Sequence, residues 1–298
     1  MCENINQLIE TIGQRNPLQR KYFENSFLLS DEEITELNQV IDFFNEDYSI
    51  EKMAEAYLLF VEDTLNETKY FTEVRGERYR YKSLNEVNDK VYQNEQYMNK
   101  YMLGLMLSGY LWDNHRKIHQ WFKKQAAEFS GHNFLEIGPG HGMYFTEMLN
   151  LNRFEKYFAI DLSDTSLKMT ERFIRKFAHN KVPYELICND VYSYAFDTLF
   201  DGVVISEVLE HVENPDHLLN IIYNITSQNA DIYVNVPINA PAIDHIFLFS
   251  NIDEVKSIID QNGFRIIDQC IVTGNNKSIE RAIQKKYAIN YAFRMKKK

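Results

Sequence analysis

The sequence predicts an α/β fold preceded by a helical region, because its texture changes once along its 298 residues. In the first part, glycine is absent between Gly13 and Gly76, and apolar residues recur every three or four positions, as in MAEAYLLFVEDTL. From about residue 131, short apolar runs alternate with helical stretches, which indicates βαβ units and a mostly parallel sheet. We therefore expect a helical cap over residues 1–128 and a sheet domain over residues 129–298.

The second region is expected to contain seven strands and four helices. The predicted strands cover 133–137, 156–161, 184–188, 202–206, 231–236, 264–272 and 283–293, and the predicted helices cover 142–150, 163–179, 215–228 and 251–262. Ser163 and Asn251 can cap free N–H groups, Pro215 suits a first helical position, and Gly263 suits a left-handed cap. The last two strands are joined by a loop without a helix, so we expect them to form an antiparallel hairpin.

The composition excludes several function classes. No stretch approaches the roughly 18 to 20 uncharged apolar residues that span a bilayer, and the N-terminus lacks an export signal. We therefore expect a soluble cytoplasmic protein without a membrane partner. The net charge is −11 and the one basic cluster is the terminal RMKKK, so nucleic acid is set aside as a main substrate. The composition is also compatible with a homodimer.

The negative charge is concentrated in residues 31–67. This segment carries twelve acidic residues and one basic residue, Lys52, while the rest of the chain balances 31 acidic against 31 basic residues. Two interpretations stay open: a solvated helical face, or a surface that attracts a cationic acceptor.

The stretch FLEIGPGHG, residues 134–142, predicts a binding turn between a strand and a helix. It lacks the lysine and hydroxyl of a P-loop, and Met143 stands where a dinucleotide fingerprint needs its third glycine. Glu136 would repel a pyrophosphate by about 4 kcal/mol at a separation of about 4 Å. The ammonium and sulfonium of S-adenosylmethionine would instead be attracted, and Gly138 and Gly140 allow a close backbone approach.

Acidic residues also follow the next two predicted strands. Asp161, nineteen residues past Gly142, can accept hydrogen bonds from both hydroxyls of a ribose, and Leu162 can lie against an adenine. Asp190 can accept from the adenine amino group, and the Val191 N–H can donate to a ring nitrogen. Together with Glu136, these acids favour a cation that carries a nucleoside.

The stretches EIGPGHG, AIDLS, ICNDV and FDGVVISEVLEHVENPDHLL resemble the successive motifs of class I S-adenosylmethionine-dependent methyltransferases, in the branch with ubiquinone-type and natural-product enzymes. The resemblance covers about residues 131–292 and implies a Rossmann-like sheet of order 3-2-1-4-5-7-6 with strand 7 antiparallel. It implies S-adenosylmethionine as cofactor and S-adenosylhomocysteine as product. It also implies cofactor contacts, with Glu136, Gly138 and Gly140 at the methionine end, Asp161 at the ribose, Asp190 at the adenine, and Ser206 and Glu207 on the sulfonium side. The residues before 128 fall outside it; in related enzymes such additions form a lid and acceptor pocket.

The loop VNVPINAPAIDHIFLFS follows the fifth predicted strand, at the edge where open α/β sheets bind ligands. We predict His245 as the general base where the acceptor must lose a proton, with Asp244 orienting it or contacting the acceptor. Alternatively, His245 packs the lid and bonds a backbone carbonyl. His211 is interpreted as structural or cofactor-lining. His211 and His217 lack the HExxH spacing, so we expect no metal ion.

We therefore expect a methyltransferase that acts on an oxygen or nitrogen of a small-molecule acceptor, such as a secondary metabolite or a sugar-like compound. The stretch SEVLEH stands where nucleobase amino methyltransferases carry Asn or Asp, two prolines and an aromatic residue, which again disfavours nucleic acid. Two other classes stay open. One is a catalytically silent methyltransferase fold that serves as a binding module, and the other is a protein methyltransferase, which needs an open groove.

Overall fold

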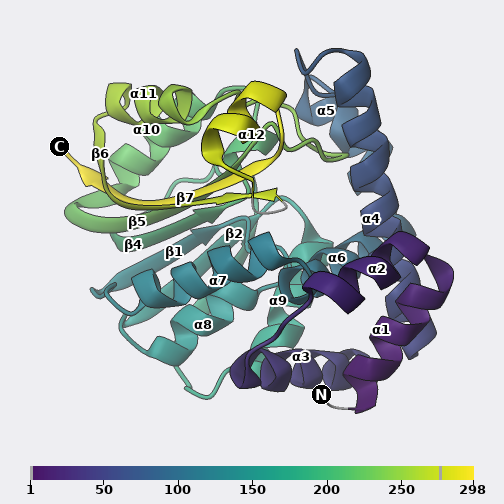
Figure 1. Cartoon of the computed structure of the whole chain (residues 1–298). Helices are drawn as coiled ribbons and strands as arrows, with labels where there is room; N and C mark the ends of the chain where they lie inside the picture. The colour runs from purple at the N-terminus through teal and green to yellow at the C-terminus, as the bar shows by residue number, and fades with distance from the viewer. Residues whose placement is uncertain (1–2, 275–276) are drawn as a thin grey trace.

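The computed structural model of the chain describes residues 3–274 and 277–298. Figure 1 shows a central sheet with helices on both faces and a group of N-terminal helices beside it. Within the described ranges, no helix combines the length and the apolar character needed to cross a membrane.

The sheet has seven strands in the order β3-β2-β1-β4-β5-β7-β6. Strands β1 to β5 pair in parallel, and β7 runs antiparallel to both of its neighbours, which confirms the predicted order and direction. The carboxyl ends of the five parallel strands therefore share one edge. The strands are β1 (Asn133–Ile137), β2 (Lys156–Asp161), β3 (Tyr184–Cys188), β4 (Phe200–Ser206), β5 (Thr226–Ile238), β6 (Phe264–Thr273) and β7 (Ile289–Lys297).

Two layers of helices bury the faces of the sheet (Figure 1). One core contains residues of α10 (Pro215–Ile225), α11 (Ile252–Gln261) and α12 (Ile279–Lys285). The other contains residues of α7 (Asp113–Ala126), α8 (Met143–Leu151) and α9 (Asp164–Phe177). In this second core the rings of Phe122 and Tyr144 stack at 4.0 Å, and Phe122 meets Tyr233 edge-on at 4.9 Å. Because α7 packs on the sheet, the helices that pack only within the cap end near Leu111. The predicted boundary between cap and sheet domain at about residue 128 stays a prediction.

The cap helices form a core of their own, to which Met143 of α8 and Phe173 of α9 also contribute. Ser30 and Glu33 form a capping box at the start of α3. Helices α4 and α6 approach closely, since a Cβ added at Gly104 would lie 2.4 Å from the Ala56 carbonyl oxygen. The cap helices are α1 (Glu3–Arg15), α2 (Pro17–Ser26), α3 (Asp31–Phe44), α4 (Ile50–Glu73), α5 (Leu84–Val87) and α6 (Glu95–Leu111), with a π-helical turn at Asn88–Tyr92.

The connection between β6 and β7 differs from the prediction. We expected a loop and a strand over 283–293, but the chain forms α12 before β7 begins at Ile289. The Ser278 hydroxyl accepts a hydrogen bond from the Arg281 N–H at 3.3 Å and caps this helix, which ends at Lys286 in a left-handed conformation. The start of the predicted strand was therefore wrong, because Ile283 belongs to a short helix in which Ala282 is buried and Ile283 is exposed.

The acidic segment 31–67 is largely used in ion pairs with basic residues elsewhere in the chain. Some of these pairs attach α3 to α7, others attach the turn after α3 to α9, and one joins α1 to α4. They are Glu33–Arg116, Glu36–Lys123, Glu46–Lys176, Asp47–Arg172 and Arg15–Glu55. The segment therefore holds the cap against the sheet layer, which leaves fewer of its charges for a cationic acceptor.

Candidate active site

A cavity of about 780 Å³ lies at the carboxyl edge of the parallel strands, between the sheet and the cap. This volume falls within the range of about 300 to 1,000 Å³ for small-molecule sites. The sheet side supplies the turns after β1, β2, β3 and β4 and the loop after β5, and the cap side supplies aromatic and methionine residues of α4, α6 and the π-helical turn. On the cap side these include Phe60, Tyr92, Met98, Tyr101, Met102 and Trp112.

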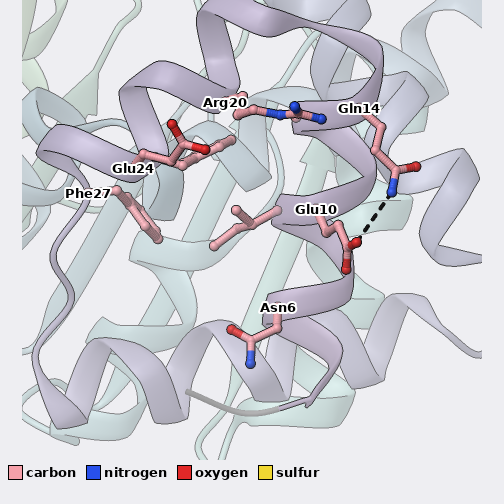
Figure 2. Close-up of a pocket in the computed structure, with 9 residues that line it drawn as sticks. Asn6, Glu10, Gln14, Arg20, Glu24 and Phe27 are labelled. Carbon is pink, nitrogen blue, oxygen red and sulfur yellow. Dashed lines mark hydrogen bonds between the residues drawn. The ribbon is translucent and has the colours of Figure 1, made fainter.

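A second hollow of about 420 Å³ lies between α1 and α2 (Figure 2). Its polar side chains include Arg20 and Glu24, which are exposed, and Gln14, which donates to Glu10 at 3.3 Å. This hollow lies in the cap and has none of the strand-end residues that the sequence singled out. We therefore take the larger cavity as the candidate site.

The glycine turn after β1 depends on three left-handed glycines. Gly138 has φ +68°, and a Cβ there would lie 2.7 Å from Cγ2 of Val208. Gly142 has φ +84°, and a Cβ there would lie 2.7 Å from Cα of Thr170. Gly140 has φ +56°, and its carbonyl accepts a hydrogen bond from the Thr170 hydroxyl at 3.0 Å. Only glycine fits these positions without strain, and the turn forms part of the cavity lining.

Glu136 lies beneath this turn, near the end of β1. Glu136 is 2% exposed, and its Oε2 atom has no hydrogen-bond partner among the described residues. Burial, and next the nearby Glu147 and Asp161, raise its pKa well above the usual range. A buried carboxyl without a partner is unfavourable on its own, so this atom fits a ligand that brings a positive charge or hydrogen-bond donors.

Asp161 and Leu162 end β2 beside this turn. Asp161 Oδ1 accepts a hydrogen bond from the Ser163 N–H at 2.8 Å, and burial raises the pKa of its carboxyl to about 6. Leu162 is 52% exposed and lines the cavity. The pair thus presents a carboxylate and an apolar surface next to each other.

Asp190 and Val191 follow β3 and also line the cavity. Asp190 Oδ1 accepts a hydrogen bond from the Tyr192 N–H at 2.9 Å, so one of its oxygens closes the local turn. Both residues are half-buried. Their positions are compatible with the adenine contacts implied by the resemblance.

Ser206 and Glu207 end β4 at the centre of the edge. Glu207 has φ +56°, a left-handed conformation that is unusual for a residue with a side chain. Asn235 of β5 fixes it, because the Glu207 N–H donates to the Asn235 carbonyl at 2.9 Å and Asn235 Nδ2 donates to Glu207 Oε1 at 2.6 Å. Burial, followed by repulsion from Asp244, raises the pKa of Glu207 to about 8. Such strain is found at functional sites more often than elsewhere.

His245 is held by a backbone carbonyl and not by Asp244. Its Nδ1 donates to the Ala240 carbonyl at 2.8 Å, and burial lowers the pKa of the ring to about 3. This agrees with the alternative expectation that His245 bonds a backbone carbonyl, and no hydrogen bond between Asp244 and His245 is found among the described residues. The Asp244 carboxylate instead accepts hydrogen bonds from the hydroxyls of Tyr92 and Tyr101, each at 3.3 Å.

Several cavity residues escaped the sequence analysis. Tyr92 and Tyr101 are two of 19 tyrosines in the chain, and nothing local links them to Asp244 more than 140 residues away. Asn235 sits inside an apolar strand in the stretch VNVP, where an amide that faces a strand end could have been noticed. Glu210 was passed over within SEVLEH, yet it is fully buried.

The cavity is strongly unbalanced in charge. Its lining contains six carboxyl groups among the described residues, and no lysine or arginine lies among them. Acids that face one another in a buried space repel, and such repulsion adds to the effect of burial in raising the pKa values of Glu136 and Glu207. A ligand with a sulfonium and an ammonium group would reduce this repulsion. The six are Glu136, Asp161, Asp164, Asp190, Glu207 and Asp244.

Comparisons with known proteins agree with this geometry. A family described as a methyltransferase domain matches residues 135–232, from β1 into β5. The N-methyltransferase NodS from Bradyrhizobium japonicum WM9, in complex with S-adenosyl-L-homocysteine, superposes with a TM-score of 0.50 at 15% identity, over 68% of this chain and 97% of that one. Phosphoethanolamine N-methyltransferase 2 from Haemonchus contortus, in complex with S-adenosyl-L-methionine, gives a TM-score of 0.50 at 16% identity, over 74% of this chain and 60% of that one.

No curated protein matches the sequence. The two structural likenesses lie below 25% identity and show the fold alone, whereas the family match covers the motifs that carry the predicted cofactor residues. The family match over residues 135–232 and the sheet order show that this part of the chain is a class I S-adenosylmethionine-dependent methyltransferase domain.

Proposed function

We propose that this enzyme methylates an oxygen or nitrogen of a small molecule bound between the sheet and the cap. The observation that carries the proposal is the shape of the cavity, which is walled by strand-end turns on one side and by α4, α6 and the π-helical turn on the other. A protein acceptor would need a groove that admits a chain segment, and the cap lies where that groove would open. The ubiquinone-type and natural-product branch stays a prediction.

We assign the cofactor to the side of the cavity formed by β1, β2 and β3. Glu136 and the backbone of Gly138 and Gly140 would hold the methionine end. Asp161 would accept from the ribose hydroxyls. S-adenosylmethionine supplies a methyl group on a cationic sulfur, which is reactive toward a neutral or anionic acceptor atom. The remaining contacts would come from Leu162, Asp190 and Val191 at the adenine and from Ser206 and Glu207 beside the sulfonium.

The acceptor would occupy the other part of the cavity, under the cap. Asp244 faces this part with both oxygens engaged by Tyr92 and Tyr101, so these three residues form a fixed polar contact surface. Phe60 and Tyr101 pack at 5.5 Å, and Phe60 and Trp112 at 5.2 Å, and these rings exclude water from the cavity. Alignment and exclusion of water are the main contributions that a protein makes to such a transfer.

A general base is a separate question. A histidine whose pKa is about 3 accepts a proton only weakly near neutral pH, which counts against His245 as the base. That role stays a prediction, and Asp244 is the better candidate for direct contact with the acceptor because its side chain is fixed toward the cap.

The proposal is tested by supplying methyl-tritiated S-adenosylmethionine to the purified enzyme with a cell lysate, then separating small molecules from proteins. We expect enzyme-dependent label in the small-molecule fraction, and much less label with Asp161→Asn. Label in the protein fraction would favour a protein acceptor. Absence of label in both fractions, with S-adenosylhomocysteine still bound by the folded protein, would favour the silent binding module.

A further inference from the structure

Glu210, His211 and His245 bring three metal-binding donor atoms together beside the proposed acceptor space. All three atoms lie within 4.8 Å of one another. Nε2 of His211 is 3.7 Å from Glu210 Oε1, and Nε2 of His245 is 3.9 Å from the same oxygen. In a tetrahedral site with bonds of about 2.1 Å the donor atoms lie about 3.4 Å apart, so small side-chain shifts would complete the geometry.

Hydrogen bonds on the far side of both rings fix the donor atoms. His211 Nδ1 faces the Asp244 carbonyl at 2.9 Å, and His245 Nδ1 faces the Ala240 carbonyl at 2.8 Å. A carbonyl oxygen can only accept, so each Nδ1 carries a proton, and in the neutral ring Nε2 keeps its lone pair. Both lone pairs lie near Glu210. A ligand histidine that donates its other N–H to a carbonyl is the usual arrangement around protein-bound metals.

Glu210 is the least satisfied carboxyl group of the cluster. The residue is 0% exposed, and neither side-chain oxygen has a hydrogen-bond partner among the described residues. Burial, followed by repulsion from Glu207, raises its pKa well above the usual range. Its backbone is fixed, because the Glu210 carbonyl accepts from the N–H groups of Ile246 and Phe247 at 2.8 and 2.9 Å. The side-chain interaction of Glu210 is with the carboxyl group of Glu207, another acid, so a bound dication would compensate the negative charge that the two residues share.

The cluster opens toward the cavity on one side. His211 and His245 line it, next to Glu207 and Asp244, whereas Glu210 lies behind them. Protein ligands on one side and space on the other are typical of a catalytic metal site, which keeps positions open for water or substrate.

We propose that Glu210, His211 and His245 bind one divalent first-row transition-metal ion, such as zinc, and that its open positions take a hydroxyl oxygen of the acceptor. Two imidazole nitrogens favour such an ion over magnesium, which prefers oxygen ligands. The acceptor part of the proposal rests on the proposed function, and the metal-binding part does not.

A hydroxyl bound at this position would lose its proton more easily. In the transfer, that proton passes to water and the acceptor oxygen forms the new bond to the methyl carbon. The electron pair of the broken carbon–sulfur bond stays on sulfur, which becomes a neutral thioether. The proposal selects oxygen from the two acceptor atoms left open above, and it removes the need for His245 as a base.

This proposal replaces the sequence-based expectation of a metal-free site. That expectation compared His211 with His217, whose spacing does not fit the HExxH pattern. The third donor comes instead from His245, on the loop after β5, and only the fold brings it to Glu210 and His211.

The test measures metal binding directly on the full chain after removal of metals with a chelator. Zinc and magnesium are titrated separately by calorimetry, and cobalt is added to follow its visible absorption. The variants are Glu210→Gln, His211→Gln and His245→Gln, with His217→Gln as a matched control because that histidine is exposed and outside the cluster. Circular dichroism and melting temperature establish that each variant is folded, and S-adenosylhomocysteine affinity is measured on the same metal-free samples.

We expect one zinc ion per chain, much weaker binding of magnesium, and a loss of zinc affinity of at least about tenfold in each cluster variant but not in His217→Gln. Folded wild-type protein that binds no zinc, or that binds it equally well after the cluster substitutions, would overturn the proposal. Failure to bind S-adenosylhomocysteine would instead overturn the assignment of the cofactor site and leave the metal result standing.

Discussion

The affinity for S-adenosylhomocysteine should fall as the pH is lowered through 6, because of Asp161. Its carboxyl has a pKa of about 6, raised mainly by burial, and the nucleoside hydroxyls are expected to bind the charged form. If the ligand binds the charged form, its binding lowers the pKa of Asp161, and a protonated Asp161 must release its proton before the ligand can bind. The affinity for S-adenosylhomocysteine is therefore fully present above the pKa of the free enzyme and is lost progressively below it. Glu136 and His211 are the charged or titratable groups that act on Asp161 from β1 and the turn after β4.

The size of the effect follows from the protonated fraction of Asp161 in the free enzyme. With a pKa of about 6, about one molecule in ten carries the charge at pH 5, against nearly all at pH 7.5. The dissociation constant should therefore rise about tenfold between these pH values, equivalent to about 1.4 kcal/mol. Glu136 would add to the slope, since its pKa is also raised.

The matched variant is Asp161→Asn, measured by calorimetry from pH 5 to 8. An Asn oxygen can still accept from the Ser163 N–H, which Asp161 does at 2.8 Å, so the turn should be kept. At pH 7.5 we expect a loss of affinity of roughly 1.5 to 3 kcal/mol from the missing charge-assisted hydrogen bonds. Glu136 is present in both proteins, so a steeper pH slope in the wild type than in Asp161→Asn reports the loss of the Asp161 charge. Equal pH slopes in the two proteins would refute the reasoning.

Three further predictions concern the cap and the acceptor space. Gly104→Ala should lower the melting temperature by about 5 to 10 °C, because its Cβ would lie 2.4 Å from the Ala56 carbonyl oxygen. Gly109→Ala in the same helix would place its Cβ at an ordinary contact distance of 3.7 Å from Met143 Cε, and it should be neutral or stabilising by up to about 1 kcal/mol. Similar melting temperatures for both would contradict the close packing of α4 on α6. His245→Ala should lower turnover at least about a hundredfold with S-adenosylhomocysteine affinity nearly unchanged, because the proposed metal site loses one ligand, and full turnover would remove His245 from the mechanism. Tyr101→Phe should raise the Michaelis constant for the acceptor about threefold to tenfold, because Asp244 loses one hydrogen-bond donor; an unchanged constant would place the acceptor elsewhere.

The sequence predicted the first three strands to the residue, because each is a short apolar run bounded by turn residues. Strand β5 begins at Thr226, five residues before the predicted start at 231. The prediction missed these residues because several of them, such as Gln228 and Asn229, are polar and exposed and give no apolar signal. Helix α12 was missed because its seven residues contain too few apolar positions for helical periodicity to be visible.

The candidate site also contains residues that the sequence predicts and residues that it does not. The strand-end acids could be predicted because each follows its strand directly, and parallel strands place such residues on one edge. Contacts between distant segments could not be predicted. The hydrogen bonds of Tyr92 and Tyr101 with Asp244, and the approach of His245 to Glu210, depend on how the cap and the loop after β5 pack. No local spacing encodes them.

The central claim is that acidic residues at the ends of β1 and β2 receive a sulfur cation with its attached nucleoside. A crystal structure with S-adenosylhomocysteine tests it most directly. The account predicts the amino group of the ligand against Glu136 and its ribose hydroxyls against Asp161. A ligand bound outside this cavity, with both carboxyl groups remote from it, would contradict the account.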